Sequence, residues 1–403
     1  MVVVQINFSC LWGSTGKICD SVSKLLSEKN IENYLFYIFD NRKDKSQNYI
    51  KYGNFVYTKF QALKSKVLGN YGFNSSLATK RLIRRLKAIK PDIVHIHNIH
   101  GHDCHFEILF KYFRENNIKV FYTFHDCWAF TGYCPHFAMV KCNKWLDSCH
   151  SCILRKRYSW FFDRSDSNFI RKRKALEGLD LTIITPSEWL GSLVKKSFLK
   201  KYPVKVINNG IDLNVFKPTE SQFRSKYGLE NKKIVLGVSC VWDERKGFDV
   251  FIELAKSLPS DYAIVLVGTN SDNDKQLPDN VISIHHTQNQ EELAMIYTAA
   301  DVFVNPTREE NYPTVNMESL ACGSPVITFE TGGSPEMLDE SCGSVVAYDD
   351  IQSLKNEITR VCSEKPYSTE QCLNKAKGFD KNDRLKEYVD IYERAVFTRT
   401  QGN

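Results

Sequence analysis

Residues 305–336 read NPTREENYPTVNMESLACGSPVITFETGGSPE and contain clear signals for the start and the end of a helix. A Pro-Thr pair suits the start of a helix, Gly323 suits the position just after its end, and Pro325 cannot continue it. The pattern therefore predicts a helix over Thr314–Cys322, with a strand before it and another after it. A strand, a helix and a strand in this order predict a parallel sheet.

The same alternation of strand and helix patterns extends outward from this stretch in both directions. KIVLGVS, FDVFIELAKSL and YAIVLVG precede it, and VVVQINF, SVSKLLSE, DIVHIHN and KVFYTFH occupy the first half of the chain. At 403 residues the chain is long enough for two domains. We therefore expect an α/β protein of two Rossmann-like, doubly wound domains that face each other across a cleft.

The expected domain boundary follows a helical stretch that ends near Lys201. This gives an N-terminal domain over residues 1–202 and a C-terminal domain over residues 203–403. The strand pattern KVINNGI, residues 205–211, is expected to open the second domain. The last helix could pack back on the first domain.

The start of the helix predicted at Thr314 is a candidate anion site. Free backbone amides around Thr314 and Val315 suit a diphosphate. Glu310 precedes the helix and Glu318 lies about one turn inside it, so the two carboxylates could flank one ligand and accept hydrogen bonds from its hydroxyls. A second interpretation stays open, in which these glutamates only complement the helix dipole.

With its surroundings, the segment resembles the E-x7-E region of family 4 retaining glycosyltransferases, also called group 1, which have the GT-B fold. The resemblance implies that Glu310 contacts the donor sugar and that Glu318 binds the nucleotide ribose. The following TGGSPE turn, residues 331–336, is also similar to the family. The matching patterns cover most of the chain, and their order is more specific than any single one.

A second block, residues 233–258, places Lys246 between a strand pattern and a helix pattern. Lys246 resembles the family lysine that neutralises the donor diphosphate, where a cation stabilises the leaving group as its charge develops. Many relatives have an arginine six residues earlier, where this chain has Cys240. Arg245 adjoins Lys246, and whether it replaces that second cation stays open.

Four residues of the first half are candidates for the same reaction by resemblance. Gly16 follows the first strand and is expected nearest the donor, although its loop fits neither the dinucleotide nor the nucleoside triphosphate glycine motif. His125 resembles the histidine that faces the donor sugar at the reaction centre. His97 and Asn98 are expected to line the acceptor side. His95 alternates inward on its strand and is predicted to lie in the core.

The resemblance implies a hexosyltransferase that uses a nucleotide diphosphate sugar, retains the anomeric configuration and needs no cofactor for catalysis. His125 and Glu310 are the expected catalytic residues. The expected donor-binding residues are Gly16, Lys246, Thr314, Val315 and Glu318. Two alternatives stay open: a nucleotide-sugar epimerase on the GT-B fold, and a non-catalytic protein that binds sugar nucleotides.

Charge is divided unevenly along the chain. Residues 1–200 carry 32 Lys and Arg against 16 Asp and Glu, whereas residues 201–403 carry 22 against 31. The basic half suggests a polyanionic partner, either a phosphorylated acceptor or an anionic membrane surface. Such a membrane could display a lipid-linked O-antigen, capsule or exopolysaccharide precursor, and no nucleic-acid partner is expected. Solvated helix faces are the alternative. Two basic clusters could form one membrane-facing side: Arg81, Arg84, Arg85, Lys87 and Lys90, and Arg171, Lys172, Arg173 and Lys174.

The start of the chain and its cysteine content both bear on the cellular compartment. The N-terminal run MVVVQINF has no basic flank and is expected to be a buried strand rather than a signal peptide, so we expect a cytoplasmic protein, at the inner face of the membrane if it binds lipid. Its thirteen cysteines should then be reduced. Cys134, Cys142, Cys149 and Cys152 could hold a structural zinc ion or remain unliganded thiols.

Overall fold

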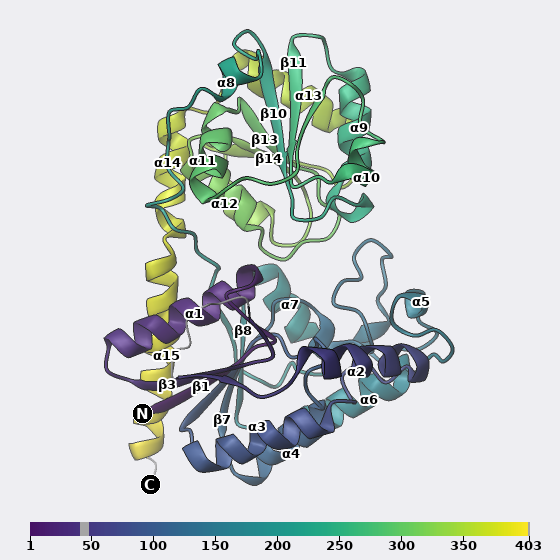
Figure 1. Cartoon of the computed structure of the whole chain (residues 1–403), viewed down its shortest axis with the longest axis vertical. Helices are drawn as coiled ribbons and strands as arrows, with labels where there is room; N and C mark the ends of the chain where they lie inside the picture. The colour runs from purple at the N-terminus through teal and green to yellow at the C-terminus, as the bar shows by residue number, and fades with distance from the viewer. Residues whose placement is uncertain (41–47, 402–403) are drawn as a thin grey trace. The chain divides into compact units, whose positions relative to one another are not determined.

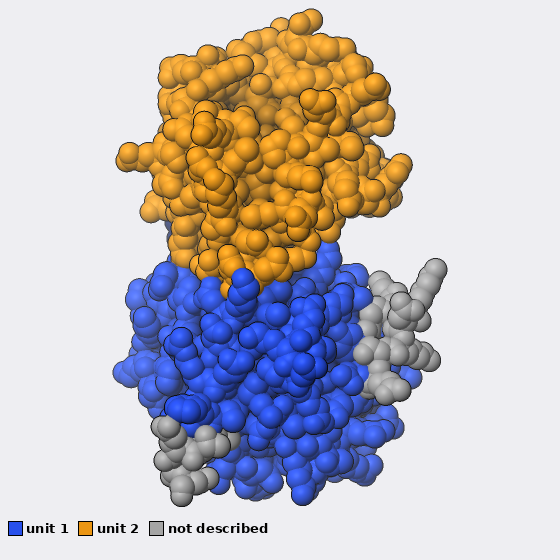
Figure 2. Space-filling model, turned by 90° about the vertical axis from the view of Figure 1, so that its left-hand side faces the viewer, with its two compact units in different colours: residues 1–207, 385–403 blue, residues 208–384 orange. Residues whose placement is uncertain are grey.

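The protein folds into two compact units in the computed structural model, which describes residues 1–40 and 48–401. Unit 1 combines residues 1–207 with residues 385–403, and unit 2 is formed by residues 208–384. Figure 2 colours unit 1 blue and unit 2 orange. The chain thus returns to its first unit at its end.

Unit 1 is built on a parallel sheet with the strand order β5-β3-β1-β6-β7-β8-β9. Its strands are β1 (Val2–Ile6), β3 (Glu32–Tyr37), β5 (Tyr49–Lys51), β6 (Ile93–Ile96), β7 (Lys119–Thr123), β8 (Leu181–Thr185) and β9 (Val204–Val206), beside the small pair β2 (Ser9–Cys10) and β4 (Phe39–Asp40). Its helices are α1 (Gly13–Glu28), α2 (Phe55–Leu68), α3 (Ser76–Ile89), α4 (Phe106–Glu115), α5 (Arg155–Tyr158), α6 (Ser165–Leu176) and α7 (Glu188–Lys196), with the 3-10 turns η1 (Trp128–Phe130) and η2 (Lys144–Leu146).

Unit 2 has a second parallel sheet with the order β12-β11-β10-β13-β14-β15. Its strands are β10 (Lys233–Val238), β11 (Tyr262–Val267), β12 (Val281–Ile284), β13 (Val302–Asn305), β14 (Val326–Phe329) and β15 (Gly343–Val346). Its helices are α8 (Phe223–Lys226), α9 (Phe248–Ser257), α10 (Ser271–Asp274), α11 (Gln290–Ala299), α12 (Thr314–Ala321), α13 (Ile351–Glu364) and α14 (Thr369–Ala376), with the turns η3 (Glu244–Lys246), η4 (Pro335–Met337) and η5 (Lys377–Phe379). The last helix, α15 (Lys381–Gln401), starts in unit 2 and continues into unit 1.

Side chains of β10 show why the second sheet is covered on both faces. Ile234 and Leu236 belong to one hydrophobic cluster, and Val235 between them belongs to another. Successive residues of a strand point to opposite faces, so both faces of the sheet are buried under helices. The continuous apolar strand patterns of the sequence have this cause.

The boundaries of α12 confirm the prediction made from residues 305–336. The helix covers Thr314–Ala321, and Gly323 follows its end with a φ of 88°. Glycine adopts this left-handed conformation without steric cost, which ends the helix where the sequence indicated.

One strand prediction was wrong. The start of the stretch expected to open the second domain, Lys205 and Val206, belongs to β9, which pairs in parallel with β8 and is the edge strand of the first sheet. The helix α7 crosses from β8 to β9 as an ordinary βαβ connection, so the chain leaves unit 1 only after Ile207.

Helix α15 closes one face of the first sheet (Figure 1). Leu385, Tyr388 and Val389 pack in one cluster with Val3 and Phe121. The same region contains the fully buried His95, which confirms that this histidine lies in the core.

Buried hydrogen bonds fix His95 between two elements. Its Nδ1 is paired with the hydroxyl of Tyr392 on α15, and its Nε2 lies 2.8 Å from Thr123 Oγ1 at the end of β7.

Among the described helices, none is both long and apolar enough to cross a membrane.

Replacing Tyr392 with phenylalanine should destabilise unit 1. The Tyr392→Phe change leaves a buried nitrogen of His95 without its partner, so we expect the free energy of unfolding to fall by about 1–3 kcal/mol. Urea denaturation measures this value. The control Tyr227→Phe alters a tyrosine that is 37% exposed and should change stability little. Equal effects of the two changes would contradict the role of the His95–Tyr392 pair.

Candidate active site

The loop after β13, residues 306–313, carries Glu310 to the start of α12. Glu310 forms an ion pair with Lys246 of η3, and both side chains are 20% exposed. The second oxygen of Glu310 accepts a hydrogen bond of 3.1 Å from the backbone N–H of Asn311. Glu310 and Lys246 were both expected to contact the donor nucleotide sugar. The structure places their side chains in contact with each other.

Glu318 lies on α12, in the same unit. Its Oε2 accepts a hydrogen bond of 3.1 Å from the hydroxyl of Tyr297 on α11. Burial, and then the charge of Glu318, raises the pKa of Tyr297 well above its usual value, so this hydroxyl remains a donor. Thr314 and Val315, half-buried, begin α12, whose first N–H groups have no intrahelical acceptor.

Two glycines allow the loops of this site to approach closely. A Cβ on Gly332 would lie 1.9 Å from the carbonyl oxygen of Glu310, and Gly333 N–H donates to Asn311 O at 2.9 Å. A Cβ on Gly247 would lie 2.5 Å from Pro306 O. Gly332 and Gly247 have positive φ, so no other residue fits either position without moving the loop.

Arg308, which no sequence pattern indicated, connects the two loops. Its guanidinium donates to Asp249 and to Asp349, at 2.8 Å each, and to the carbonyl oxygen of Glu244 at 2.6 Å. Only 6% of Arg308 is exposed. Its partners are 59 and 41 residues away in sequence, so no local pattern could have indicated them. Arg308 thus holds the Lys246 turn against the Glu310 loop.

The structure does not show whether Arg245 supplies a second cation beside Lys246, so this role stays a hypothesis. Cys240 is exposed, and Arg245 Nε lies 3.9 Å from Asp243 Oδ2. The exposure of Cys240 and the Arg245–Asp243 contact do not show that Arg245 binds a ligand.

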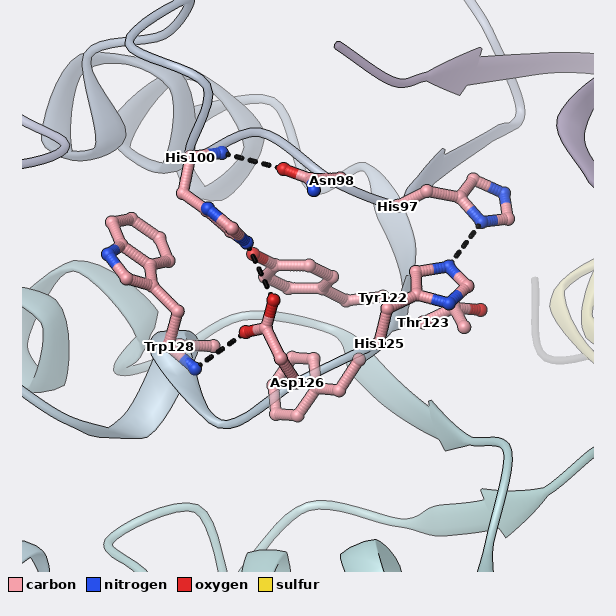
Figure 3. Close-up of a pocket in the computed structure, with 10 residues that line it drawn as sticks. His97, Asn98, His100, Tyr122, Thr123, His125, Asp126 and Trp128 are labelled. Atoms are coloured by element: carbon pink, nitrogen blue, oxygen red, sulfur yellow. Dashed lines mark hydrogen bonds and ion pairs between the residues drawn. The ribbon is translucent and has the colours of Figure 1, made fainter. Parts of the chain in front are cut away.

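Unit 1 contains a pocket at the ends of β6 and β7 (Figure 3). His97 Nδ1 lies 3.3 Å from His125 Nε2, and their rings are stacked with centroids 5.6 Å apart. Asn98 lines the same pocket, and its side chain accepts a bond of 3.2 Å from His100 N. The structure therefore brings together three residues that the sequence assigned to the reaction centre and the acceptor side.

A second pair in this pocket was not predicted. His100 Nε2 lies 2.8 Å from Asp126 Oδ2, and Asp126 Oδ1 accepts from Trp128 N at 2.8 Å. Burial alone would raise the pKa of Asp126, but the charge of His100 and these hydrogen bonds outweigh burial and lower it to about 2. Asp126 is thus a fixed negative charge beside His125.

Two histidines of the pocket, His97 and His125, are neutral at physiological pH. Burial lowers the pKa of His125 to about 4, against a smaller opposing effect of Asp126. Burial also lowers the pKa of His97 well below its ordinary value. Neutral imidazoles can both donate and accept hydrogen bonds, which suits contacts with hydroxyl groups.

Gly16 lies in the first turn of α1, not in the preceding loop. A Cβ there would lie 3.0 Å from Leu11 N and 3.2 Å from Ser9 Oγ. Close packing against the chain that leaves β2 is one reason for a glycine at this position. Its donor role stays a prediction.

The four candidate zinc ligands lie in the part of the chain that the structure describes, and they do not form a recognisable metal site there. Sγ of Cys134 and Sγ of Cys152 lie 4.0 Å apart, whereas Cys149 Sγ accepts a bond from Gly132 N at 3.2 Å. Within residues 1–40 and 48–401, no group of three or more His, Cys, Asp or Glu side chains is arranged to hold a metal. Zinc binding stays a prediction for Cys134, Cys142, Cys149 and Cys152. Elemental analysis of the purified protein measures its zinc content.

The basic cluster of residues 171–174 lies only partly at the surface, because one of its lysines is buried. Lys172 is fully buried and donates to Trp128 O at 2.7 Å and to Thr131 O at 3.0 Å. Arg171 is paired with Glu107. The expectation that residues 171–174 together form a membrane-facing side was therefore wrong for Lys172, because this side chain binds the end of η1 instead.

Two family models match consecutive parts of the chain. Residues 23–215 match "Glycosyltransferase Family 4", and residues 219–383 match "Glycosyl transferases group 1". The chain therefore belongs to the family 4, group 1, glycosyltransferases.

Individual relatives are more distant. The D-inositol 3-phosphate glycosyltransferase of Mycobacterium sp. (strain JLS) is 25% identical over 208 residues, which are 48% of this chain and 47% of that protein. The chain thus spans about half the length of the curated relatives it matches.

Solved structures are similar over nearly the whole chain. Sucrose-phosphate synthase from Thermosynechococcus elongatus has a TM-score of 0.74 at 17% identity and covers 99% of this chain and 100% of its own. Anabaena HepE in complex with UDP-glucose has a TM-score of 0.67 at 14% identity, with 98% and 100% covered. The fold is GT-B, with two Rossmann-like domains on sheets of seven and six strands in the described residues.

Acid should destabilise unit 1 through its buried histidines. An unfolded histidine has a pKa of about 6.5, and folding lowers the pKa of His125 to about 4. Between these values the unfolded chain binds more protons, so stability should fall as the pH drops from 7 to 5.

The variant His125→Gln tests this pH dependence. The variant should lose about 1–2 kcal/mol less stability than the wild type over this pH range, as measured by urea denaturation at each pH. The control His150→Gln alters an exposed histidine and should keep the wild-type slope. Parallel pH profiles for wild type and His125→Gln would contradict the lowered pKa.

Proposed function

We propose that this chain transfers a hexose or deoxyhexose from a nucleotide diphosphate sugar to a saccharide acceptor, with retention of the anomeric configuration. One observation carries the proposal: the Glu310–Lys246 ion pair lies on loops joined by Arg308, directly before α12. This site lies within the part of the chain that matches the group 1 model.

In this proposal, unit 2 binds the donor. The first N–H groups of α12, at Thr314 and Val315, hold the diphosphate with Lys246. Lys246 has three N–H donors, so it can contact a phosphate oxygen and Glu310 together. Glu318 accepts hydrogen bonds from the ribose, and Glu310 accepts them from the sugar.

The chemistry proposed needs no classical base. The acceptor hydroxyl attacks the face from which the nucleoside diphosphate leaves, and the departing phosphate takes the acceptor proton. Lys246 and the helix amides stabilise the negative charge of the leaving group. His125, which is neutral, orients the sugar, while Gly16 adjoins the donor and His97 and Asn98 contact the acceptor.

Donor and acceptor are proposed by class. The similar HepE binds UDP-glucose, which makes this nucleotide sugar the first donor to test. The basic first half favours an anionic lipid-linked saccharide at the inner face of a cytoplasmic membrane.

A thermal-shift panel of nucleotide sugars identifies the donor. The true donor should raise Tm with concentration, because a ligand that binds only the folded state stabilises it. Lys246→Ala and Glu318→Gln should each weaken donor binding about tenfold or more, since each removes a charge-assisted contact. Calorimetric titration measures the Kd of each variant.

Lys256→Ala is the matched control for Lys246→Ala. Lys256 is an exposed lysine on α9, so its removal should leave the Kd unchanged. Wild-type affinity in the Lys246→Ala and Glu318→Gln variants would contradict the assigned donor site.

Product analysis separates the proposal from its two alternatives. A transferase needs an acceptor, whereas an epimerase converts one nucleotide sugar into another without one. Glu310→Gln should abolish transfer but not folding. Epimerised donor without acceptor, or tight donor binding without transfer to any saccharide, would support the epimerase or the non-catalytic binding protein instead.

A further inference from the structure

Helix α2 of unit 1 presents its apolar side to solvent. Val56, Phe60 and Leu63 lie four and three residues apart, so they share one face, and they are 73%, 63% and 49% exposed. The residues that α2 buries are Thr58, Gln61 and Ser65. A surface helix normally buries its apolar face, so this inverted pattern marks an interaction surface.

A loop of three aromatic residues adjoins the end of α2. Trp160, Phe161 and Phe162 are 49%, 64% and 51% exposed. Trp160 N–H donates to Lys66 O at 2.7 Å, and the Lys66 ammonium lies 6.0 Å from the centroid of the Trp160 ring. The loop and the exposed face of α2 are therefore continuous, and α2 and α5 lie on the same side of the unit in Figure 1.

The aromatic loop is held in its exposed conformation by Arg155. The guanidinium of Arg155 donates to Trp160 O at 3.3 Å and to Phe161 O at 2.9 Å. Backbone bonds of this kind fix the loop while its three rings remain outside. The exposure is thus built into the local structure.

Positive charge surrounds these apolar side chains. Exposed cations of the two segments are Lys59, Lys64, Lys66, Lys156, Arg157 and Arg164. Residues 51–91 carry ten Lys and Arg and no Asp or Glu. In the loop, Asp163 accepts bonds from Cys152 N at 2.6 Å and from Ser165 N at 2.9 Å. A surface this basic favours an anionic partner.

We propose that this apolar–basic surface, formed by Val56, Phe60, Leu63 and residues 160–162 with their neighbouring cations, docks the protein on an anionic lipid membrane. The aromatic and aliphatic side chains enter the boundary between headgroups and acyl chains. The lysines and arginines contact lipid phosphates, with their aliphatic stems along the apolar side chains.

Charge distinguishes a membrane from a second copy of this chain. A symmetric dimer through this surface would place the same lysines and arginines opposite one another, which is unfavourable. An anionic bilayer instead supplies both the apolar layer and the negative charge that the surface lacks.

Vesicle co-sedimentation without nucleotide sugar or acceptor tests the inference, so its result does not depend on the proposed function. The full chain should bind phosphatidylglycerol vesicles and should bind phosphatidylcholine vesicles more weakly. The double variant Phe60→Ser, Phe161→Ser should reduce the partition coefficient about tenfold or more, because two exposed phenyl rings no longer enter the bilayer.

Phe397→Ser is the matched control. Phe397 lies on α15 and is 63% exposed, which is close to the values of Phe60 and Phe161, and its replacement should leave vesicle binding unchanged. Thermal unfolding of all three proteins checks that they are folded.

Three results would overturn the proposal. The first is no binding of the wild type to anionic vesicles, and the second is unchanged binding of the double variant. The third is concentration-dependent self-association that the double variant abolishes without vesicle binding by the wild type, which would assign the surface to a second copy.

Discussion

The geometry of the Glu310–Lys246 site in unit 2 depends on one backbone contact, between Gly332 and the carbonyl group of Glu310. A side chain at Gly332 would overlap that oxygen, so the loop before α12 can lie where it does only because this residue is glycine. Arg308 ties the same loop to Asp249 and to the turn that carries Lys246. The Glu310–Lys246 pair is the consequence of these two restraints.

Local signals explain which parts of the structure the sequence could predict. The ends of α12 are encoded by residues at the helix termini, and the burial of His95 follows from its position on an apolar strand. The candidate site residues Glu310 and Lys246 were assigned through family resemblance, and the structure shows them in contact. The proposed roles of these residues still rest on that resemblance.

Features that depend on distant pairing were missed. The two carboxylate partners of Arg308 come from separate parts of the chain, and β9 joins the first sheet because β8 offers it an edge. Lys172 was expected at the surface, but its ammonium group binds backbone carbonyl groups at the end of η1. The exposed apolar face of α2 also contradicts the usual interpretation of its pattern, since the sequence alone does not tell which face packs inward.

Hydrogen–deuterium exchange of the full chain, with and without a saturating nucleotide diphosphate sugar, tests the central claim most directly. If the donor binds at α12, amides of residues 314–317 and of the Lys246 turn should exchange more slowly in the complex, because they bind or adjoin the diphosphate. Unchanged exchange in both segments, with protection elsewhere in unit 2, would contradict the account.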